Sequence, residues 1–444
     1  MACGAFRASG PRPTFALARK SFAFALLLLL LAPAFRFFAS YAIGIMDRRE
    51  PSEPFKPCRR RDRLLGMVTE SLSRRSILKA AGSAGIMGGL LEAGPVIYEE
   101  APAPLQDDTP KHKIRFAVIG LDHSHINGIT DTMRRSGGEL AAVHSTNAPA
   151  LAAFQERCRD VKAARTEDEI LSDSSIQLVC SAAVPNIRAP LGVRVMRHGK
   201  DFLCDKPAIT TLQQLAEVRR AVKETGRMFA IVYGRLESRV TLHAGALVKE
   251  GAIGKVIQTI QLAPHLVNEK TRPDWFWDPA LYGGTLCDLG SHQADEFVFF
   301  TGSTSADVTC SQVANVNHPH RPKFQDFGDM VIHGNNGFGY FRVDWFTPES
   351  LGVFGDERTF ILGTEGYIET RKTIDIAGRP GGDHLFIVDR KMARYIDCKN
   401  LPLPFGTQFA ADIANRTETA QDQVAALLAS ELVLKGQKNA RILS

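Results

Sequence analysis

The sequence predicts an α/β protein in which a doubly wound parallel sheet precedes a second α/β domain with an open, mixed and largely antiparallel sheet. From Lys113 to Tyr233, short β-branched runs alternate with amphipathic helical patterns, as a parallel sheet covered by helices requires. After Gly254, longer strands with alternating polarity are joined by turn sequences, which indicates antiparallel pairing. The predicted parts are a leader over 1–110, a first domain over 111–235 and a second over 236–444.

Strands of the first domain are predicted at 115–119, 140–143, near 161, and at 176–181, 201–204 and 228–233. The helix after the first strand should bury Ile126, Ile129 and Met133, which recur at helical spacing. Asn147 is expected to cap the next helix, and Gly226 to end the last one. In the second domain, strands are predicted at 255–262 and 338–346, with turns at 335–337 and 363–366.

Length and composition fit a folded globular protein. The 444 residues suit two or three domains, and 44% are hydrophobic and 23% charged. The net charge of +6 arises in residues 1–80, which hold 15 Lys and Arg against 5 Asp and Glu and leave 39 against 43 for the rest. Because nucleic-acid binding needs clustered cations on the folded domain, we expect no nucleic-acid partner.

The leader holds two notable segments. Ser73-Arg-Arg-Ser-Ile-Leu-Lys79 and the Gly/Ala-rich run after it resemble a twin-arginine export signal over about 73–103. Residues 1–66 are then interpreted as an over-read gene start. The leucine-rich Ser21–Phe35 has only 15 residues, fewer than the roughly 18 that cross a bilayer. We therefore expect no stable membrane span in the mature chain and a periplasmic or membrane-associated protein, cytoplasmic if the signal is not used.

The first strand leads into Gly120-Leu-Asp122-His123-Ser124-His125. A dinucleotide-binding loop has glycine at its first, third and sixth positions, and only Gly120 matches. The strand, loop and helix context still favours nucleotide binding; in the alternative, Asp122 or Ser124 merely caps the helix. Asp122, His123 and His125 could also bind a metal ion, but we predict no metal site.

The second strand ends without the acidic residue that usually contacts the ribose of NAD. Ser145 and Thr146 stand there instead. Small hydroxyl side chains could accept a 2′-phosphate, so the sequence favours NADP over NAD.

Asp205, Lys206 and Pro207 follow the fifth strand, at the sheet edge where a cofactor and a substrate would meet. There Lys206 could stabilise a developing alkoxide, or it could be a solvated loop lysine. In the second domain, Asp288, His292 and Asp295 would share one face of a helix. His292 with a nearby aspartate could transfer a proton, although a core histidine would show the same pattern. A metal on that face is disfavoured because three ligands from one helix rarely close a site.

Together these motifs resemble the Gfo/Idh/MocA family of oxidoreductases over about 113–444. The resemblance is carried by the Gly120 loop; by Val184, Pro185 and Asn186; by Asp205, Lys206 and Pro207; by Gly283 and Gly284 with Asp288, His292 and Asp295; and by Gly363 to Gly366. It implies an N-terminal Rossmann domain, a C-terminal sheet that often forms dimers or tetramers, and hydride transfer between NAD(P) and a sugar, cyclitol or related polyol. By the same resemblance, Lys206 positions the substrate hydroxyl, His292 is the general acid/base and Asp288 orients the site.

Three departures from the family concern the cofactor: the degenerate glycine loop, the missing ribose-binding acid, and Arg188 where the family commonly has histidine. We expect tightly bound NADP or NAD and a homo-oligomer. A redox-neutral glycoside hydrolase of the same fold and a non-catalytic carbohydrate-binding descendant remain alternatives. Candidate substrate contacts are Tyr233, Arg235, His265, Trp275, Trp277 and Asp295, since aromatic rings pack on sugars and charged side chains bind their oxygens.

Overall fold

A computed structural model describes residues 96–101 and 109–443 of the chain. These residues belong to one compact unit, Leu91–Ser444. The interpreted over-read start over 1–66, the leucine-rich segment and the twin-arginine motif lie outside the described residues. No helix among those that are described is long and apolar enough to cross a membrane.

The first sheet confirms the predicted doubly wound arrangement. Its six strands are all parallel, in the order β4-β3-β2-β5-β6-β7. The strands are β2 (Ile114–Ile119), β3 (Gly138–His144), β4 (Lys162–Ala163), β5 (Leu178–Ser181), β6 (Asp201–Asp205) and β7 (Phe229–Val232). The helices are α3 (His125–Arg135), α4 (Ala148–Arg157), α5 (Glu167–Leu171), α6 (Pro185–Arg197) and α7 (Leu212–Thr225). The strand order reverses between β2 and β5, so a ligand is expected beyond their carboxyl ends.

Local signals in this domain act as predicted. Ile126, Ile129 and Met133 are buried on α3. The Asn147 side chain accepts a hydrogen bond from the backbone N–H of Ala150 and caps α4. Gly226 takes a left-handed conformation with φ 61° and ends α7.

The second sheet has ten strands in the order β1-β15-β14-β13-β12-β8-β11-β10-β9-β16. It is mixed: β8 pairs parallel with β11 and antiparallel with β12. The strands are β1 (Ile97–Glu100), β8 (Val256–Pro264), β9 (Ala306–Ala314), β10 (Phe327–Gly334), β11 (Gly337–Asp344), β12 (Arg358–Gly363), β13 (Gly366–Arg371), β14 (His384–Asp389), β15 (Ala393–Asp397) and β16 (Arg441–Leu443). The predicted turns at 335–337 and 363–366 join β10 to β11 and β12 to β13.

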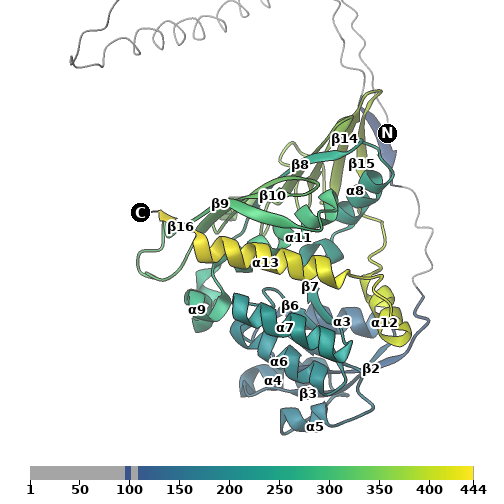
Figure 1. Cartoon of the computed structure of the whole chain (residues 1–444), viewed down its shortest axis with the longest axis vertical. Coiled ribbons are helices and arrows are strands. Elements are labelled where there is room, and N and C mark those ends of the chain that lie inside the picture. The colour runs from purple at the N-terminus through teal and green to yellow at the C-terminus, as the bar shows by residue number, and fades with distance from the viewer. Residues whose placement is uncertain (1–95, 102–108, 444) are drawn as a thin grey trace, which may run out of the picture. The chain divides into compact units, whose positions relative to one another are not determined.

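Of the helices of the second half, α11 (Gly290–Thr301) and α13 (Gln423–Asn439) lie between the two sheets (Figure 1). The others are α8 (Arg239–Lys249), α9 (Pro279–Tyr282), α10 (Thr285–Asp288) and α12 (Phe405–Asn415). Phe409 of α12 joins the core formed by α3 and β2. The end of the chain therefore returns to stabilise the first domain.

One boundary is corrected by the structure. The predicted leader extended to residue 110, but Ile97–Glu100 form strand β1, which pairs parallel with β15 at the sheet edge. The short apolar-polar run was hidden by the signal-like composition around it. A cleavage at about residue 103 would remove β1, so a processed chain that keeps this strand must be cut before Ile97.

Candidate active site

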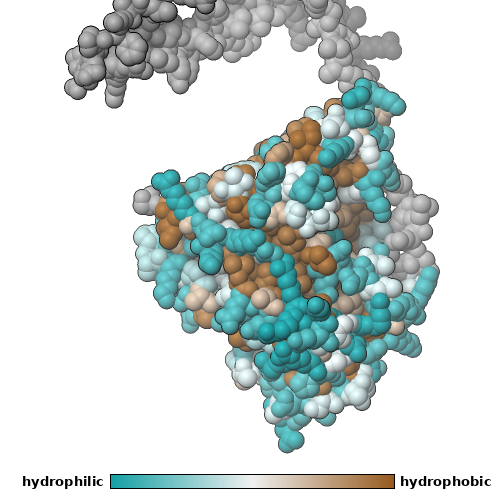
Figure 2. Space-filling view, viewed as in Figure 1, coloured by the Kyte–Doolittle hydropathy of each residue, from teal (hydrophilic) through white to brown (hydrophobic). Residues whose placement is uncertain are grey.

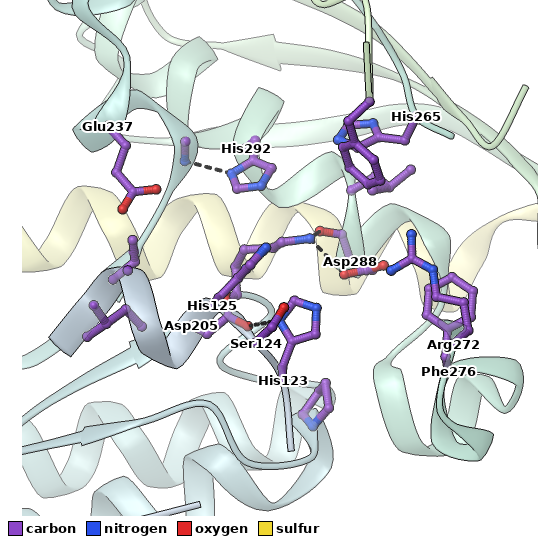
Figure 3. A pocket seen from close by; sticks show the side chains of 18 of the residues that line it. His123, Ser124, His125, Asp205, Glu237, His265, Arg272, Phe276, Asp288 and His292 are labelled. Carbon is purple, nitrogen blue, oxygen red and sulfur yellow. Dashed lines mark hydrogen bonds and ion pairs between the residues drawn. The ribbon is translucent and has the colours of Figure 1, made fainter. Parts of the chain in front are cut away.

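A cavity of about 380 Å³ lies between the carboxyl edge of the first sheet and the second domain. Figure 3 shows side chains from both halves pointing into it. It brings together ten of the predicted site residues: His123, Ser124, His125, Pro185, Asp205, Lys206, His265, Trp275, Asp288 and His292.

Lys206 and Asp288 form an ion pair across the cavity floor. Lys206 follows β6, whose end brings it to the sheet edge, and Asp288 is the last residue of α10. The Lys206 Nζ donates hydrogen bonds to Oδ1 of Asp288 at 2.8 Å and to its backbone oxygen at 3.0 Å. Burial alone would raise the pKa of Asp288, but the nearby Lys206 cation keeps that pKa below its ordinary value. Asp288 therefore orients the ammonium group and leaves its third proton for a ligand.

His292 is held by backbone rather than by a carboxylate. The N–H of Gly234 donates to His292 Nδ1 at 2.7 Å. Burial, followed by the Lys206 and Lys372 cations, lowers the pKa of His292 well below its ordinary value. Since a backbone amide cannot lose its proton, Nδ1 must be the acceptor and the neutral ring carries its proton on Nε2.

The predicted single helical face around His292 is wrong in detail. α10 ends at Asp288 and α11 begins at Gly290, so the three polar residues do not stand on one regular helix. Asp295 instead accepts hydrogen bonds from Arg235 Nε at 2.8 Å and Nη2 at 3.1 Å. Asp288 and Asp295 are thus bound by Lys206 and Arg235, and His292 bonds to the Gly234 amide instead.

Asp205 organises the loop after β2. It accepts hydrogen bonds from His123 Nδ1 at 2.9 Å and His125 Nδ1 at 3.0 Å, and Arg188 Nη2 lies 3.0 Å from its Oδ2. Burial opposes ionisation, but Arg188 and the two histidines hold the pKa of Asp205 well below its usual range. Arg188, buried on α6, also donates to the backbone oxygens of Ala183 and Lys206, both at 2.6 Å.

The same three side chains also have the composition of a metal site. One ligand atom from each of His123, His125 and Asp205 lies within 4.8 Å of the others. Arg188, however, already supplies the positive charge that balances Asp205, and a cation placed there would be repelled by the guanidinium. We therefore assign the cluster to hydrogen bonding, in which the two imidazoles brace the loop against β6.

The loop has features that fit the diphosphate of a dinucleotide. Gly120 has φ 86°, and a Cβ there would lie 2.5 Å from the Cβ of Ala183, so a side chain would clash. Ser124 precedes α3 without making a side-chain cap, and the first turn of α3 has no acidic residue. The N–H groups of Ile126 and Asn127 already donate to the backbone oxygens of His123 and Ser124, so those of Ser124 and His125 are the ones offered to an anion. The predicted side-chain cap by Ser124 is not observed.

Other predicted cofactor contacts lie outside the cavity. Ser145 and Thr146 follow β3 at the surface of the first sheet. Val184 precedes α6, the backbone oxygen of Asn186 accepts a hydrogen bond from Gln214, and Pro207 is buried after Lys206. Asp122 is partly exposed. Their cofactor roles stay predictions.

Four predicted substrate contacts are structural instead. Tyr233 is buried, and its hydroxyl bonds to the backbone oxygen of Ala426 at 3.1 Å and to Ser430 Oγ at 2.9 Å. Arg235 and Asp295 form the pair described above, with the guanidinium stacked on Phe299. Trp277 packs in the core against Phe276 and Phe324. A sequence cannot distinguish an aromatic or charged core residue from one that faces a ligand.

Four charged residues of the cavity wall were missed: Glu237, Arg272, Glu357 and Lys372. Lys372 Nζ lies 2.7 Å from Glu357 Oε2. Burial opposes charge on both, yet their attraction raises the pKa of Lys372 and lowers that of Glu357. Glu357 and Lys372 come from segments next to β12 and β13 that contain no recognisable motif, so only the pairing of these strands brings the two residues to the site.

Comparisons with known proteins agree with this architecture. The model of the oxidoreductase family with an NAD-binding Rossmann fold matches residues 114–233. The model of the GFO/IDH/MocA C-terminal domain matches residues 241–369. A solved structure of a candidate oxidoreductase from Erwinia carotovora atroseptica is 42% identical, with a TM-score of 0.73, over 75% of this chain and all of that one.

Two curated relatives are more distant. The 1,5-anhydro-D-fructose reductase of Ensifer adhaerens is 24% identical over 44% of this chain, and the scyllo-inositol 2-dehydrogenase (NADP(+)) of Bacillus subtilis is 25% identical over 35%. The matches span 58% and 43% of the lengths of these two relatives.

Proposed function

Because the chain belongs to the Gfo/Idh/MocA family of oxidoreductases, we propose that it transfers hydride between NAD(P) and a hydroxyl-bearing carbon of a sugar or polyol. One observation carries the proposal. Lys206 and His292, from separate halves of the chain, line the same cavity as the dinucleotide loop after β2. The names of the two curated relatives, a sugar reductase and a cyclitol dehydrogenase, support this substrate class.

When bound, the nicotinamide supplies the hydride or accepts it. Two donors of the chain converge on the substrate oxygen: the third N–H of Lys206 and the Nε2–H of His292. In carbonyl reduction, Lys206 gives a proton to the new alkoxide, and Asp288 keeps the ammonium group in place. His292 contributes a hydrogen bond from a neutral ring, which stabilises the developing negative charge. In oxidation, the hydroxyl proton passes to Lys206 in its uncharged form.

These roles differ from the sequence-based expectation that His292 accepts the proton. A base needs a free lone pair, and the only lone pair of the neutral ring faces Gly234 N–H. Protonating Nδ1 would set two N–H groups against each other beside two lysines. We therefore assign the proton transfer to Lys206.

For the cofactor we propose NADP in preference to NAD, tightly bound. The loop and the start of α3 would hold the diphosphate. Ser145 and Thr146 follow β3, the strand whose end contacts the ribose in this kind of fold, and their hydroxyl groups would bind a 2′-phosphate. The chain is further proposed to be exported, on the twin-arginine motif alone.

The test is to purify the full chain and to determine bound NAD and NADP by mass spectrometry. The chain is then supplied with NAD or NADP and a panel of aldoses, ketoses and cyclitols, and the reduced cofactor that forms is measured. We expect bound cofactor and activity that Lys206→Met lowers by at least about a hundredfold. Lys323→Met, which removes an exposed lysine outside the cavity, is the matched control. A protein without cofactor affinity would contradict the proposal, and release of free sugar without net cofactor reduction would point to glycoside cleavage instead.

A further inference from the structure

Arg272 lies in the wall of the cavity on the loop between β8 and α9. Its guanidinium carbon is 4.4 Å from the ring centre of Phe276 and 4.8 Å from that of Trp345. Nε donates to the backbone oxygen of Val267 at 2.6 Å, and Nη2 lies 3.4 Å from that of Leu266. Stacking and hydrogen bonds thus fix the plane of the guanidinium before any ligand arrives.

The other cations that line the cavity each have a carboxylate partner. Arg188 pairs with Asp205, Lys206 with Asp288, and Lys372 with Glu357. Arg272 forms no ion pair with any carboxylate of the described residues. Burial lowers the pKa of Arg272, and Asp288 is near enough to act in the opposite direction, but the Asp288 carboxylate is bound by Lys206. Lys206, Asp288 and Arg272 together therefore leave one positive charge in excess.

The opposite end of the cavity has different chemistry. Figure 3 shows Glu237 and Arg272 at opposite ends, with His292 and Asp288 between them. Glu237 offers carboxyl oxygens that accept hydrogen bonds from hydroxyl groups, and burial raises its pKa. The partly buried guanidinium of Arg272, by contrast, has lost much of its hydration. An anionic group of a ligand compensates this lost hydration best, because it pairs with the positive charge. A planar carboxylate matches the geometry of the guanidinium, and its single charge matches the excess.

We propose that Arg272 forms an anion subsite and that the substrate is a sugar or polyol derivative bearing a carboxylate, such as a uronic or aldonic acid. The inference rests on the proposed function only in taking this cavity as the substrate site. The carboxylate lies against Arg272, and the reacting hydroxyl lies near Lys206 and His292. A phosphate dianion would exceed the available charge, so a sugar phosphate is expected to bind less well.

The experiment measures ligand affinity by calorimetry on the full chain. The probes are D-glucuronate with D-glucose, D-galacturonate with D-galactose, D-gluconate, and D-glucose 6-phosphate. At least one acid should bind about tenfold or more tightly than its uncharged counterpart, because hydrogen bonds to charged groups contribute this much. Arg272→Met should abolish the preference, and Arg272→Lys should keep part of it.

Arg321→Met is the matched control, since Arg321 also stacks on an aromatic ring, Trp277, but lies outside the cavity. Lack of binding by all three acids, or an equal loss of acid and neutral sugar in Arg272→Met, would overturn the subsite. A preference for the phosphate would overturn the choice of carboxylate. If an acid binds through Arg272 but no cofactor is reduced, the subsite is supported and the proposed function is contradicted. If neutral sugars are oxidised and Arg272→Met does not affect this activity, the proposed function is supported and the subsite is contradicted.

Discussion

At the scale of single residues, the tautomer of His292 decides which group moves the proton. Gly234 N–H fixes the ring as a donor through Nε2, so Gln, which also offers an N–H, should replace it better than Ala. We expect His292→Ala to lower kcat by about 100-fold to 1000-fold, as loss of one oxyanion donor does, and His292→Gln to lower it less.

The pH dependence gives an independent check of the same role. The pKa of His292 lies well below its usual value, so the ring is neutral from pH 6.5 upward and should add no inflection there. The kcat profile of the wild-type chain and that of His292→Gln should therefore have the same shape above pH 6.5. An inflection near pH 7 that only the wild type shows would identify His292 as the base.

Gly120 offers a test of the cofactor loop. A Cβ at this residue meets Ala183, and the backbone has φ 86°, so Gly120→Ala should distort the loop and lower dinucleotide affinity by at least about tenfold. Gly199 also has positive φ, 75°, but has nothing within 4 Å of an added Cβ. Gly199→Ala should therefore have a similar backbone cost in stability but keep the dinucleotide affinity of the wild type, as measured by fluorescence titration. Equal affinity in both variants would argue against a dinucleotide at this loop.

At the scale of helices and strands, the sequence was informative wherever the signal is local. Apolar spacing located α3, and Asn147 and Gly226 marked helix ends, because caps and left-handed glycines depend on adjacent backbone. Lys206, Asp288 and His292 could be placed because they stand in recognisable segments. Glu357 and Lys372 could not, since their proximity to the site depends on the pairing of β8, β12 and β13.

Glu296 on α11 is an element-scale case of buried charge. It lies between α8 and β12, where Thr241 Oγ1 is 3.4 Å and Thr359 Oγ1 3.2 Å from its carboxyl oxygens. Burial, with a contribution from Glu357, raises its pKa to about 7 from 4.5, while Lys372 acts in the opposite direction. The folded chain thus holds a proton that the unfolded chain releases above pH 4.5, and stability from this group is lost as pH rises from about 4.5 to 7.

Replacing this carboxyl with an amide should remove that loss. We expect Glu296→Gln to gain stability relative to the wild type between pH 5 and pH 8, by about 2 to 3 kcal/mol, as measured by urea unfolding. Glu156→Gln, on the exposed surface of α4, should show no such trend. A Glu296→Gln variant whose relative stability is the same at both pH values would mean that Glu296 is ionised in the folded chain.

At the scale of the molecule, the two domains predicted from the sequence are joined by the end of the chain. The Tyr233 hydroxyl, at the end of the first sheet, bonds to Ala426 and Ser430 of α13, and α13 also lies against β9 and α11. This helix fixes the first sheet relative to the second domain and so sets the shape of the cavity between them. Tyr233 therefore supports the site from behind rather than from within.

The ten-stranded sheet exposes an apolar surface that should mediate self-association. Figure 2 shows hydrophobic residues near the top of the view, where strands of this sheet lie, and also at its centre, where α13 lies. Ile260 of β8 pairs with Phe360 of β12, and Leu362 pairs with Tyr367 of β13. All four are more than a third exposed, and such a contiguous patch is typical of an interface.

We expect the wild type to be a dimer or larger in light scattering, and Phe360→Glu to be monomeric with an unchanged circular dichroism spectrum. Val424→Glu places the same charge on an exposed apolar residue of α13 and should leave the assembly intact. If Phe360→Glu keeps the wild-type mass, the sheet face is not the interface.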